Sequence, residues 1–497
     1  MSKSIGTLWT VPQQLEGKRI RAVAAWADLE LELGTGYTHF ETNRTPEFEA
    51  KFSSGKIPAL ETKDGLKLFE STAIARYVAS LNPSAGLLGS NAKEAALVDQ
   101  WVSFSVNHVA QHNAVINQFI RGVLKPYVKA LDTNSRERLI QHLAIIEKHL
   151  QTQTFLVGHR ITLADITLAS ILIRSFALVL DPETRKSHPN VVRHFETVIN
   201  QPKLKDIFGQ VEYIDKQAHT LKSFRNSESS PLTSTGSSHH NYTVYTPLNY
   251  VPFEKHWNAV DGSSSTRRHP SKLLSPSSSL SILTRQAQIR ALAAWSGLEL
   301  SIGEGYTHYE TNRTPAFEEK FPNGKIPAFE GKDGLRLFES IAISRYISSL
   351  VPEAGLLGKT PKEAALINQW VAFATNNIGN HNLTISLFIR GLLKPYVKGL
   401  DIETRKRLFR GLETIDNHLS IRTFFVGEGI TLADITVASV LICSFSLVFD
   451  PDTRKKYANV VRFYKTIINQ PKLEGIFPEL VYLEKQEQYV APKKEDK

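Results

Sequence analysis

The chain has very little cysteine and no long apolar segment, although it is 497 residues long. Its one cysteine, Cys443, excludes an internal disulfide framework and fits a reducing compartment. The N-terminal region lacks the apolar run of about 7–15 residues that marks a signal peptide. No apolar stretch reaches the ~20 residues that a membrane-spanning helix needs. These absences favour a cytoplasmic protein without a membrane partner.

Composition is that of an ordinary globular protein. Hydrophobic residues make up 41% of the chain, which is enough for packed cores. The length predicts three to four domains at about 150 residues each. The formal net charge of +10 is modest for this length, so a mildly basic protein without a specific nucleic-acid partner is preferred over an RNA-associated one.

The chain contains a tandem repeat. A shift of 269 positions aligns Thr42 with Thr311 and Trp101 with Trp370 without a gap. Over residues 20–50, 22 of 31 residues are identical to those of residues 289–319. The sequence therefore predicts two copies of one module of about 200 residues rather than a solenoid of short repeats.

Residues 42–78 read as a compact α/β unit in the first copy. Pro58 stands near the start of a short apolar run, and because proline cannot donate to a sheet ladder, the strand there is at an edge or turns this gap toward a ligand. Asp64-Gly65 predicts a hairpin turn. Ser71 stands where strand becomes helix, and the free N–H groups of a helix start hold anions.

The rest of each module has helical patterns. An opening strand at residues 5–10 and a helix at residues 18–29 precede the α/β unit, and long helical patterns follow at residues 92–119 and 135–150. Thr162 and Asp165 then form a capping box before an apolar run, which predicts a buried core helix.

The α/β unit resembles the glutathione site of the glutathione transferase family, in which an X-Pro precedes a strand and a Glu/Gln-Ser precedes a helix. The longer string from TNRTPEF to FES (residues 42–71) resembles more closely the transferase-like N-terminal part of the gamma subunits of translation elongation factor 1. This resemblance implies an α+β/α fold with two tandem glutathione transferase-like modules. Each would have a thioredoxin-like α/β subdomain followed by an all-α helical subdomain.

The repeat and the resemblance together predict six segments. They are a thioredoxin-like subdomain (1–85) and an all-helical subdomain (86–216) of module 1, a serine-rich linker (217–285), a thioredoxin-like subdomain (286–354) and an all-helical subdomain (355–489) of module 2, and a charged tail (490–497). Residues 217–288 hold 16 serines and five prolines, which is typical of a disordered linker.

The second copy lacks a good opening strand. Opposite the first strand of module 1 the repeat places residues 274–281, which read LSPSSSLS. A register slip would let residues 279–284 supply a short substitute, and otherwise the module loses a strand that is interior in thioredoxin-like sheets and leaves ladder groups unpaired.

The resemblance also implies a glutathione site in each module. The residue before the proline binds the cysteinyl unit through its backbone, the acid takes the γ-glutamyl ammonium, and the serine takes the γ-glutamyl carboxylate. A preceding lysine adds a charge-assisted contact to a carboxylate. The positions are Lys56, Ile57, Pro58, Glu70 and Ser71 in module 1, and Lys325, Ile326, Pro327, Glu339 and Ser340 in module 2. The alternative is that these prolines shape the sheet and the serines only cap their helices.

Residues for catalysis are scarce. Transferases lower the pKa of the glutathione thiol with a hydroxyl or thiol just after the first strand. Thr10 is the one hydroxyl at that place in module 1, and Ser281 and Thr284 are candidates in module 2 whose position the repeat does not fix. His108 and His112 have a helical spacing that can bind metal, but no thiol or carboxylate accompanies them, so we expect interface histidines and no metal.

Two hypotheses of function follow. The first is an elongation factor 1 gamma-like scaffold of the cytoplasm that binds the beta-type nucleotide-exchange subunit in translation elongation. The alternative is a cytosolic glutathione transferase that conjugates glutathione, as ligand or substrate, to electrophiles. In either case the two copies are expected to form an intrachain pseudo-dimer or to pair in a homodimer.

Overall fold

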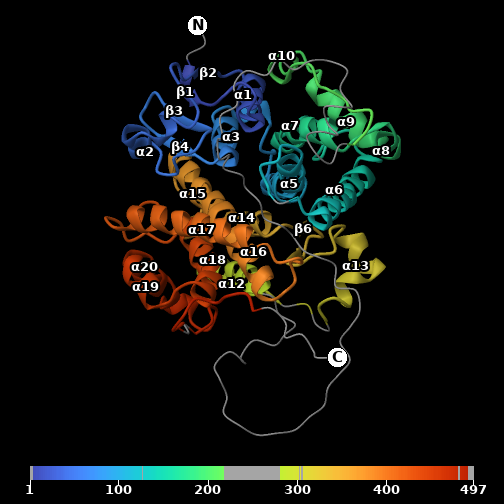
Figure 1. Cartoon of the computed structure of the whole chain (residues 1–497). Coiled ribbons are helices and arrows are strands. Elements are labelled where there is room, and N and C mark those ends of the chain that lie inside the picture. Colours follow the sequence, from blue (N-terminus) through green and yellow to red (C-terminus); the bar gives the residue numbers. More distant parts are fainter. Residues whose placement is uncertain are drawn as a thin grey trace, which may run out of the picture.

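The computed structural model describes residues 4–125, 127–217, 280–301, 303, 306–479 and 482–490. Most of the predicted linker and nearly all of the predicted tail lie outside these residues. The described chain forms two modules, one blue to green and one yellow to red (Figure 1). Each module combines a small α/β part with a larger bundle of helices.

Module 1 begins with a four-stranded sheet in the order β2-β1-β3-β4. Its strands are β1 (Ser4–Trp9), β2 (Glu30–Leu33), β3 (Ala59–Thr62) and β4 (Lys67–Phe69). Strand β1 is interior, parallel to β2 and antiparallel to β3, with Leu8 opposite Leu60. Strand β3 is therefore not an edge strand. It begins one residue after Pro58, so the missing N–H of the proline costs no ladder bond.

Three helices accompany this sheet: α1 (Leu15–Trp26), α2 (Pro46–Lys51) and α3 (Ser71–Ser80). Pro46 opens α2, and the Thr45 side chain caps it by accepting from the backbone N–H of Phe48. Helices α1 and α3 pack on each other, and their apolar faces, with Ile20, Val23 and Ile74 fully buried, cover the sheet.

The helical half of module 1 is organised around one buried helix, α7 (Leu163–Leu178). The predicted capping box is present, because the Thr162 side chain and Asp165 satisfy each other's backbone N–H groups. Around α7 lie α4 (Ala92–Phe104), α5 (Gln111–Ile120), α6 (Lys129–Leu150), α8 (Pro182–Ser187), α9 (Pro189–Ile199) and α10 (Lys205–Phe208). A π-helical turn, Ser105–Ala110, joins α4 to α5.

Module 2 repeats this order with a reduced sheet. Its elements are α12 (Leu280–Trp295), α13 (Pro315–Lys320), β5 (Ala328–Glu330), β6 (Arg336–Phe338), α14 (Ser340–Ser349), α15 (Pro361–Phe373), α16 (Asn380–Ile389), α17 (Lys398–Leu419), α18 (Leu432–Leu447), α19 (Pro451–Lys456) and α20 (Ala458–Ile468). A π-helical turn, Ala374–Gly379, again joins the first two helices of the helical half.

The predicted boundary at the start of module 2 was wrong. The linker was placed up to residue 285, whereas α12 is helical from Leu280. Of the two alternatives for the opening strand, the substitute at residues 279–284 does not form, and the strand is missing from the described residues. The segment contains no glycine or proline, and Thr284 is buried against Cys443 of α18, so a helix here gains tertiary contacts that a strand would not. The sheet of module 2 consequently has two strands among the described residues.

The two modules pack against each other as an intrachain pair. Helix α3 lies on α15, and α4 lies on α14 (Figure 1). The core of module 1 includes Phe338 of module 2, and the core of module 2 includes Phe69 of module 1. Both are edge-on to a tryptophan of the other module. Burying such a ring contributes about 1.5–3 kcal/mol, so the two phenylalanines are principal contributors to the pairing.

Hydrogen bonds and ion pairs between the modules surround these rings, and most of them occur twice, related by an approximate two-fold axis. The backbone N–H of Phe69 donates to Gln369 at 2.8 Å, and that of Phe338 donates to Gln100 at 2.9 Å. Asp99 accepts from Arg345 of module 2 at 2.8 Å, and it is also paired with Arg76 of its own module. Since its counterpart in the repeat is Asn368, the pair of modules is close to two-fold but not symmetric.

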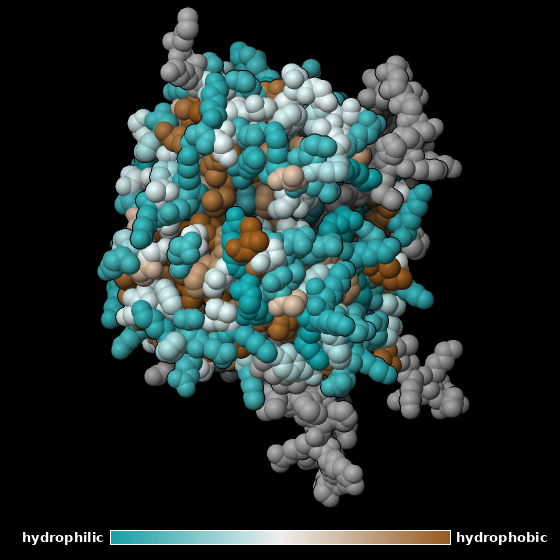
Figure 2. Space-filling view, turned by 90° about the vertical axis from the view of Figure 1, so that its left-hand side faces the viewer, coloured by the Kyte–Doolittle hydropathy of each residue, from teal (hydrophilic) through white to brown (hydrophobic). Residues whose placement is uncertain are grey.

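The face of the pair seen in Figure 2 is mostly polar. On this face, apolar residues gather in a narrow stripe in the upper half and in small separate spots. In the described ranges, no helix is long and apolar enough to cross a membrane.

The packing predicts that the modules stay together when the chain between them is cut. We expect the two halves of a chain with a protease site inserted at residue 250 to co-elute on size-exclusion chromatography after cleavage. Their shared cores hold them without a covalent link. The control is Phe69→Asp combined with Phe338→Asp, which should release the halves. Separate elution of the cleaved wild-type halves would contradict the interface.

Candidate functional site

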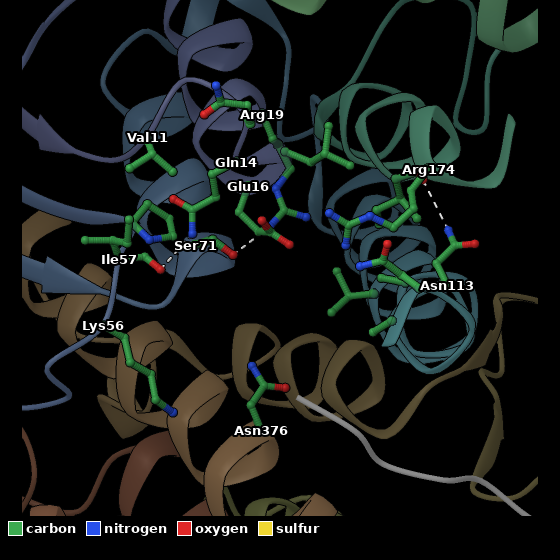
Figure 3. A pocket seen from close by; sticks show the side chains of 18 of the residues that line it. Val11, Gln14, Glu16, Arg19, Lys56, Ile57, Ser71, Asn113, Arg174 and Asn376 are labelled. Carbon is green, nitrogen blue, oxygen red and sulfur yellow. Dashed lines mark hydrogen bonds between the residues drawn. The ribbon is translucent and has the colours of Figure 1, made fainter. Parts of the chain in front are cut away.

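A cavity of about 660 Å³ opens between the α/β and helical halves of module 1. Helix α1 and the loop before β3 form one wall, α5 and α7 form the opposite wall, and module 2 closes the floor with Asn376 and Asn380 (Figure 3). Five of the ten predicted binding positions line it: Lys56, Ile57, Pro58, Glu70 and Ser71. Cavities of this size hold small peptides and cofactors.

The start of α3 presents groups that could hold an anion. Ser71 is the first residue of this ten-residue helix, whose first N–H groups have no partner within the helix. The Arg19 guanidinium, 3% exposed, donates from Nη2 to the Ser71 hydroxyl at 2.6 Å, and its Nε is buried with no hydrogen-bond partner. Burial lowers the pKa of Arg19, so an anion bound beside it would be favoured.

The loop before β3 presents backbone groups to the cavity. The peptide bond between Ile57 and Pro58 is cis, and the Ile57 carbonyl accepts from the Gln14 amide at 2.9 Å. No group of the described chain accepts from the Ile57 N–H. Lys56 beside it donates to Asn377 of module 2. Burial lowers the pKa of this lysine to about 8, although the Glu70 carboxylate opposes that shift.

Glu70 is held jointly by both modules. Its two carboxylate oxygens accept from the side-chain amides of Asn376 and Asn377, each at 2.9 Å. The backbone of Glu70 has a φ of 69°, which is uncommon for any residue except glycine. An ammonium group of a ligand at this carboxylate would therefore meet a side chain whose position depends on module 2.

Thr10 lies beside the cavity but is not among its lining residues. Its hydroxyl donates to Gln14 Oε1 at 2.8 Å, and Gly17 of α1 leaves the space that the Thr10 side chain fills. The hydrogen bond directs this hydroxyl toward Gln14, so the catalytic role offered by the sequence stays a prediction.

The five matching positions of module 2 have other surroundings. The Glu339 carboxylate accepts from Ser103 at 2.9 Å and from His108 Nε2 at 2.7 Å, both of module 1. Lys325 Nζ lies 3.3 Å from His108 Nδ1 and 3.5 Å from His142 Nε2. Ile326 and Pro327 keep the cis bond, and Ser340 opens α14. His108 is thus an interface histidine, as the sequence predicts.

Module 2 also differs at the position of Arg174. Cys443 stands on α18 where Arg174 stands on α7, and it is buried 3.2 Å from the Thr284 hydroxyl of α12. Burial raises the pKa of its thiol to about 11, which fits a buried small side chain. Helix α12 also packs on α16, so the extra turn at its start faces the helical half.

Several lining residues were not found from the sequence. Gln14, Arg19 and His39 come from the α/β half, Arg174 from α7 and Asn376 from module 2. Arg19 offered one signal, since a charged residue amid the apolar positions of a predicted helix is rarely buried without a reason. The others have no local sequence pattern. In the part of the chain that the structure describes, no group of three or more His, Cys, Asp or Glu side chains is arranged to hold a metal ion.

Comparison with models of protein families identifies two domain types in this chain, and each of them occurs twice. The N-terminal domain of glutathione S-transferase matches residues 4–80 and 278–349. The C-terminal domain of glutathione S-transferase matches residues 112–202 and 389–471. Together the two domains match more than half of the chain, in the order expected of a duplication. The chain therefore belongs to the glutathione transferase family.

Relatives within this family carry the name elongation factor 1-gamma. Elongation factor 1-gamma-A of Xenopus laevis is 38% identical over 216 residues, covering 43% of this chain and 48% of its own length. The Homo sapiens elongation factor 1-gamma is 37% identical over the same coverage. The chain thus spans about half the length of the curated relatives it matches. The crystal structure of the GST-like domain of elongation factor 1-gamma from Saccharomyces cerevisiae is 28% identical, covers 43% of this chain and 97% of its own, and has a TM-score of 0.39.

The buried histidines beside Glu339 predict that acid weakens the fold. Burial lowers the pKa of His112 to about 3 and also lowers that of His108, on which Lys325 acts in the same direction. A group with a lowered pKa is less readily protonated in the fold than in the unfolded chain, so it favours unfolding once the pH falls below about 6.5. Lowering the pH from 7 to 5 should therefore cost about 2 kcal/mol at His112, and His108 should act in the same direction.

The repeat supplies the matched variant for this test. Asn377 occupies the place of His108 in the other half, so His108→Asn should keep a bond to Glu339 without the titrating group. We expect its loss of unfolding free energy between pH 7 and pH 5, measured with urea, to be smaller than that of the wild type. An equal loss in both proteins would show that His108 does not titrate with unfolding.

Proposed function

We propose that the chain is an elongation factor 1 gamma-like scaffold of translation elongation, which binds the beta-type nucleotide-exchange subunit and works in the cytoplasm. The observation that carries this proposal is its 38% identity to elongation factor 1-gamma over 216 residues. The paired modules support it, because a rigid body with a mostly polar surface suits a scaffold. The hydroxyl of Thr10, engaged by Gln14, gives no support to catalysis as the main role.

We further propose that module 1 of this scaffold binds glutathione. The Ile57 backbone would take the cysteinyl unit, Glu70 the γ-glutamyl ammonium, and Ser71 with Arg19 the γ-glutamyl carboxylate. The support is chemical: a carboxylate, a buried guanidinium with an unpaired Nε and a helix start lie around one cavity. Lys56 would add a charge-assisted contact to the glycyl end. We assign the glutathione to module 1, whose five positions line the cavity, and not to module 2, where Glu339 and Lys325 lie in a buried cluster with His108.

The second candidate function is a glutathione transferase that conjugates glutathione to electrophiles. The cavity favours it, because space remains beyond the proposed peptide site for a second molecule. Without a hydroxyl or thiol directed at the glutathione sulfur, however, the thiol would keep a pKa near 8.5, and little thiolate would form at neutral pH.

The scaffold proposal predicts a stoichiometric partner. We expect the tagged full chain, drawn from a lysate of its own cells and washed with free glutathione, to retain the exchange subunit of elongation factor 1 as identified by mass spectrometry. A tagged single-module glutathione transferase from the same cells serves as the control bait. Recovery of no elongation factor subunit would overturn the proposal and leave the transferase as the better candidate.

The glutathione proposal predicts different roles for the two serines. In isothermal titration calorimetry with the full chain, Arg19→Met and Ser71→Ala should weaken glutathione binding by roughly tenfold or more. Each removes a hydrogen bond to a charged carboxylate, which contributes about 1.5–3 kcal/mol. The matched control is Ser340→Ala in module 2, which should bind as the wild type does. Equal losses in Ser71→Ala and Ser340→Ala would contradict the assignment to module 1.

A further inference from the structure

The charges that line the module 1 cavity are unbalanced. Four cationic side chains, Lys56, Arg19, Arg121 and Arg174, face two carboxylates, Glu16 and Glu70. Three of these six are engaged on the side of the α/β half and module 2: Arg19 with Ser71, Lys56 with Asn377, and Glu70 with Asn376 and Asn377. Of the other three, Arg174 lies on the opposite wall.

Arg174 is the centre of that excess. It is half-buried on α7, a helix that is otherwise almost entirely apolar or fully buried. Figure 3 shows its guanidinium directed into the cavity from the right, toward Arg19 and Glu16 on the other wall. No described residue makes an ion pair or hydrogen bond with it, and Glu16 is not within ion-pair distance of any described cation. A guanidinium in such a position favours an anion, since its charge is only partly solvated.

Neighbouring side chains leave this guanidinium open to a ligand. Asn113 of α5 lines the same cavity, but its side-chain amide is engaged by α7. It donates to the Ile171 carbonyl at 3.2 Å and to the Ser175 hydroxyl at 2.8 Å. Asn117 lies one turn further along α5, lines the same cavity and has no side-chain hydrogen bond among the described residues. Arg174 and the Asn117 amide thus provide donors on this side of the cavity.

We propose that this wall of module 1 binds the carboxylate of a substituent carried on the glutathione sulfur, with Arg174 as the residue that selects it. The inference rests on the proposed glutathione site. With the peptide held at Ile57 and Ser71, the sulfur substituent is the part of the ligand that extends toward α7. The ligand class is therefore an S-substituted glutathione with an acidic group near the sulfur, rather than the apolar substituent that an uncharged wall would take.

The comparison of two nearly isosteric ligands tests this proposal. Binding of S-(carboxymethyl)glutathione and S-(carbamoylmethyl)glutathione to the full chain is measured by isothermal titration calorimetry, together with glutathione itself. We expect the acid to bind about tenfold more tightly than the amide, as a charge-assisted bond to a guanidinium implies. Equal affinities of acid and amide, with glutathione still bound, would overturn the role of this wall alone. Failure of all three to bind would overturn the glutathione site and this inference together.

Variants then assign the preference to one residue. Arg174→Gln should bring acid and amide within about twofold of each other while leaving the affinity for the amide unchanged, and Arg174→Lys should keep part of the preference. Arg121→Gln is the matched control, because Arg121 lines the same cavity but is exposed, so solvent screens its charge. A preference that persists in Arg174→Gln would overturn the assignment. The acid–amide comparison in the wild type stands even if a variant does not fold.

Discussion

The pairing of the two modules is the constraint on which the rest of the structure depends. The last strand of each α/β half ends at a phenylalanine, Phe69 or Phe338, whose backbone N–H is bonded to a glutamine of the other module. The next residue is the glutamate of the predicted ligand site, and it too is held across the interface. Since one contact region fixes both the strand end and the acid, the ligand site and the interface cannot vary independently.

Much of this arrangement could be predicted from local chemistry. Pro46 and Thr45 mark the start of α2, and the Thr162–Asp165 box marks α7, because each cap depends on a hydrogen bond within a few residues. The resemblance added which of these positions meet at a cavity, and five of them do. What local chemistry could not give is a partner from the other module, such as Asn376 on Glu70, since nothing in the sequence states which surfaces come together.

The start of module 2 shows in another way what sequence patterns cannot predict. Serine-rich composition and the missing strand pointed to disorder up to residue 285, yet α12 begins at Leu280. The deciding contacts, Thr284 with Cys443 and Gln288 with Thr436, join residues more than 140 positions apart. Arg174 is a similar case, because its place opposite Arg19 follows from the packing of α7 against α5 and not from any motif.

Duplication within one chain allows the two halves to diverge while the pair persists. A homodimer has identical interface residues on both sides, whereas here Asp99 faces the interface where the repeat has Asn368, and His108 where it has Asn377. Asn377 of module 2 bonds Glu70 beside the open cavity of module 1. His108 of module 1 instead lies in a buried polar network with Glu339 and Lys325 of module 2. Such a network is costly to break once it is fully bonded, so module 2 contributes to the rigidity of the pair while module 1 keeps the space for a ligand.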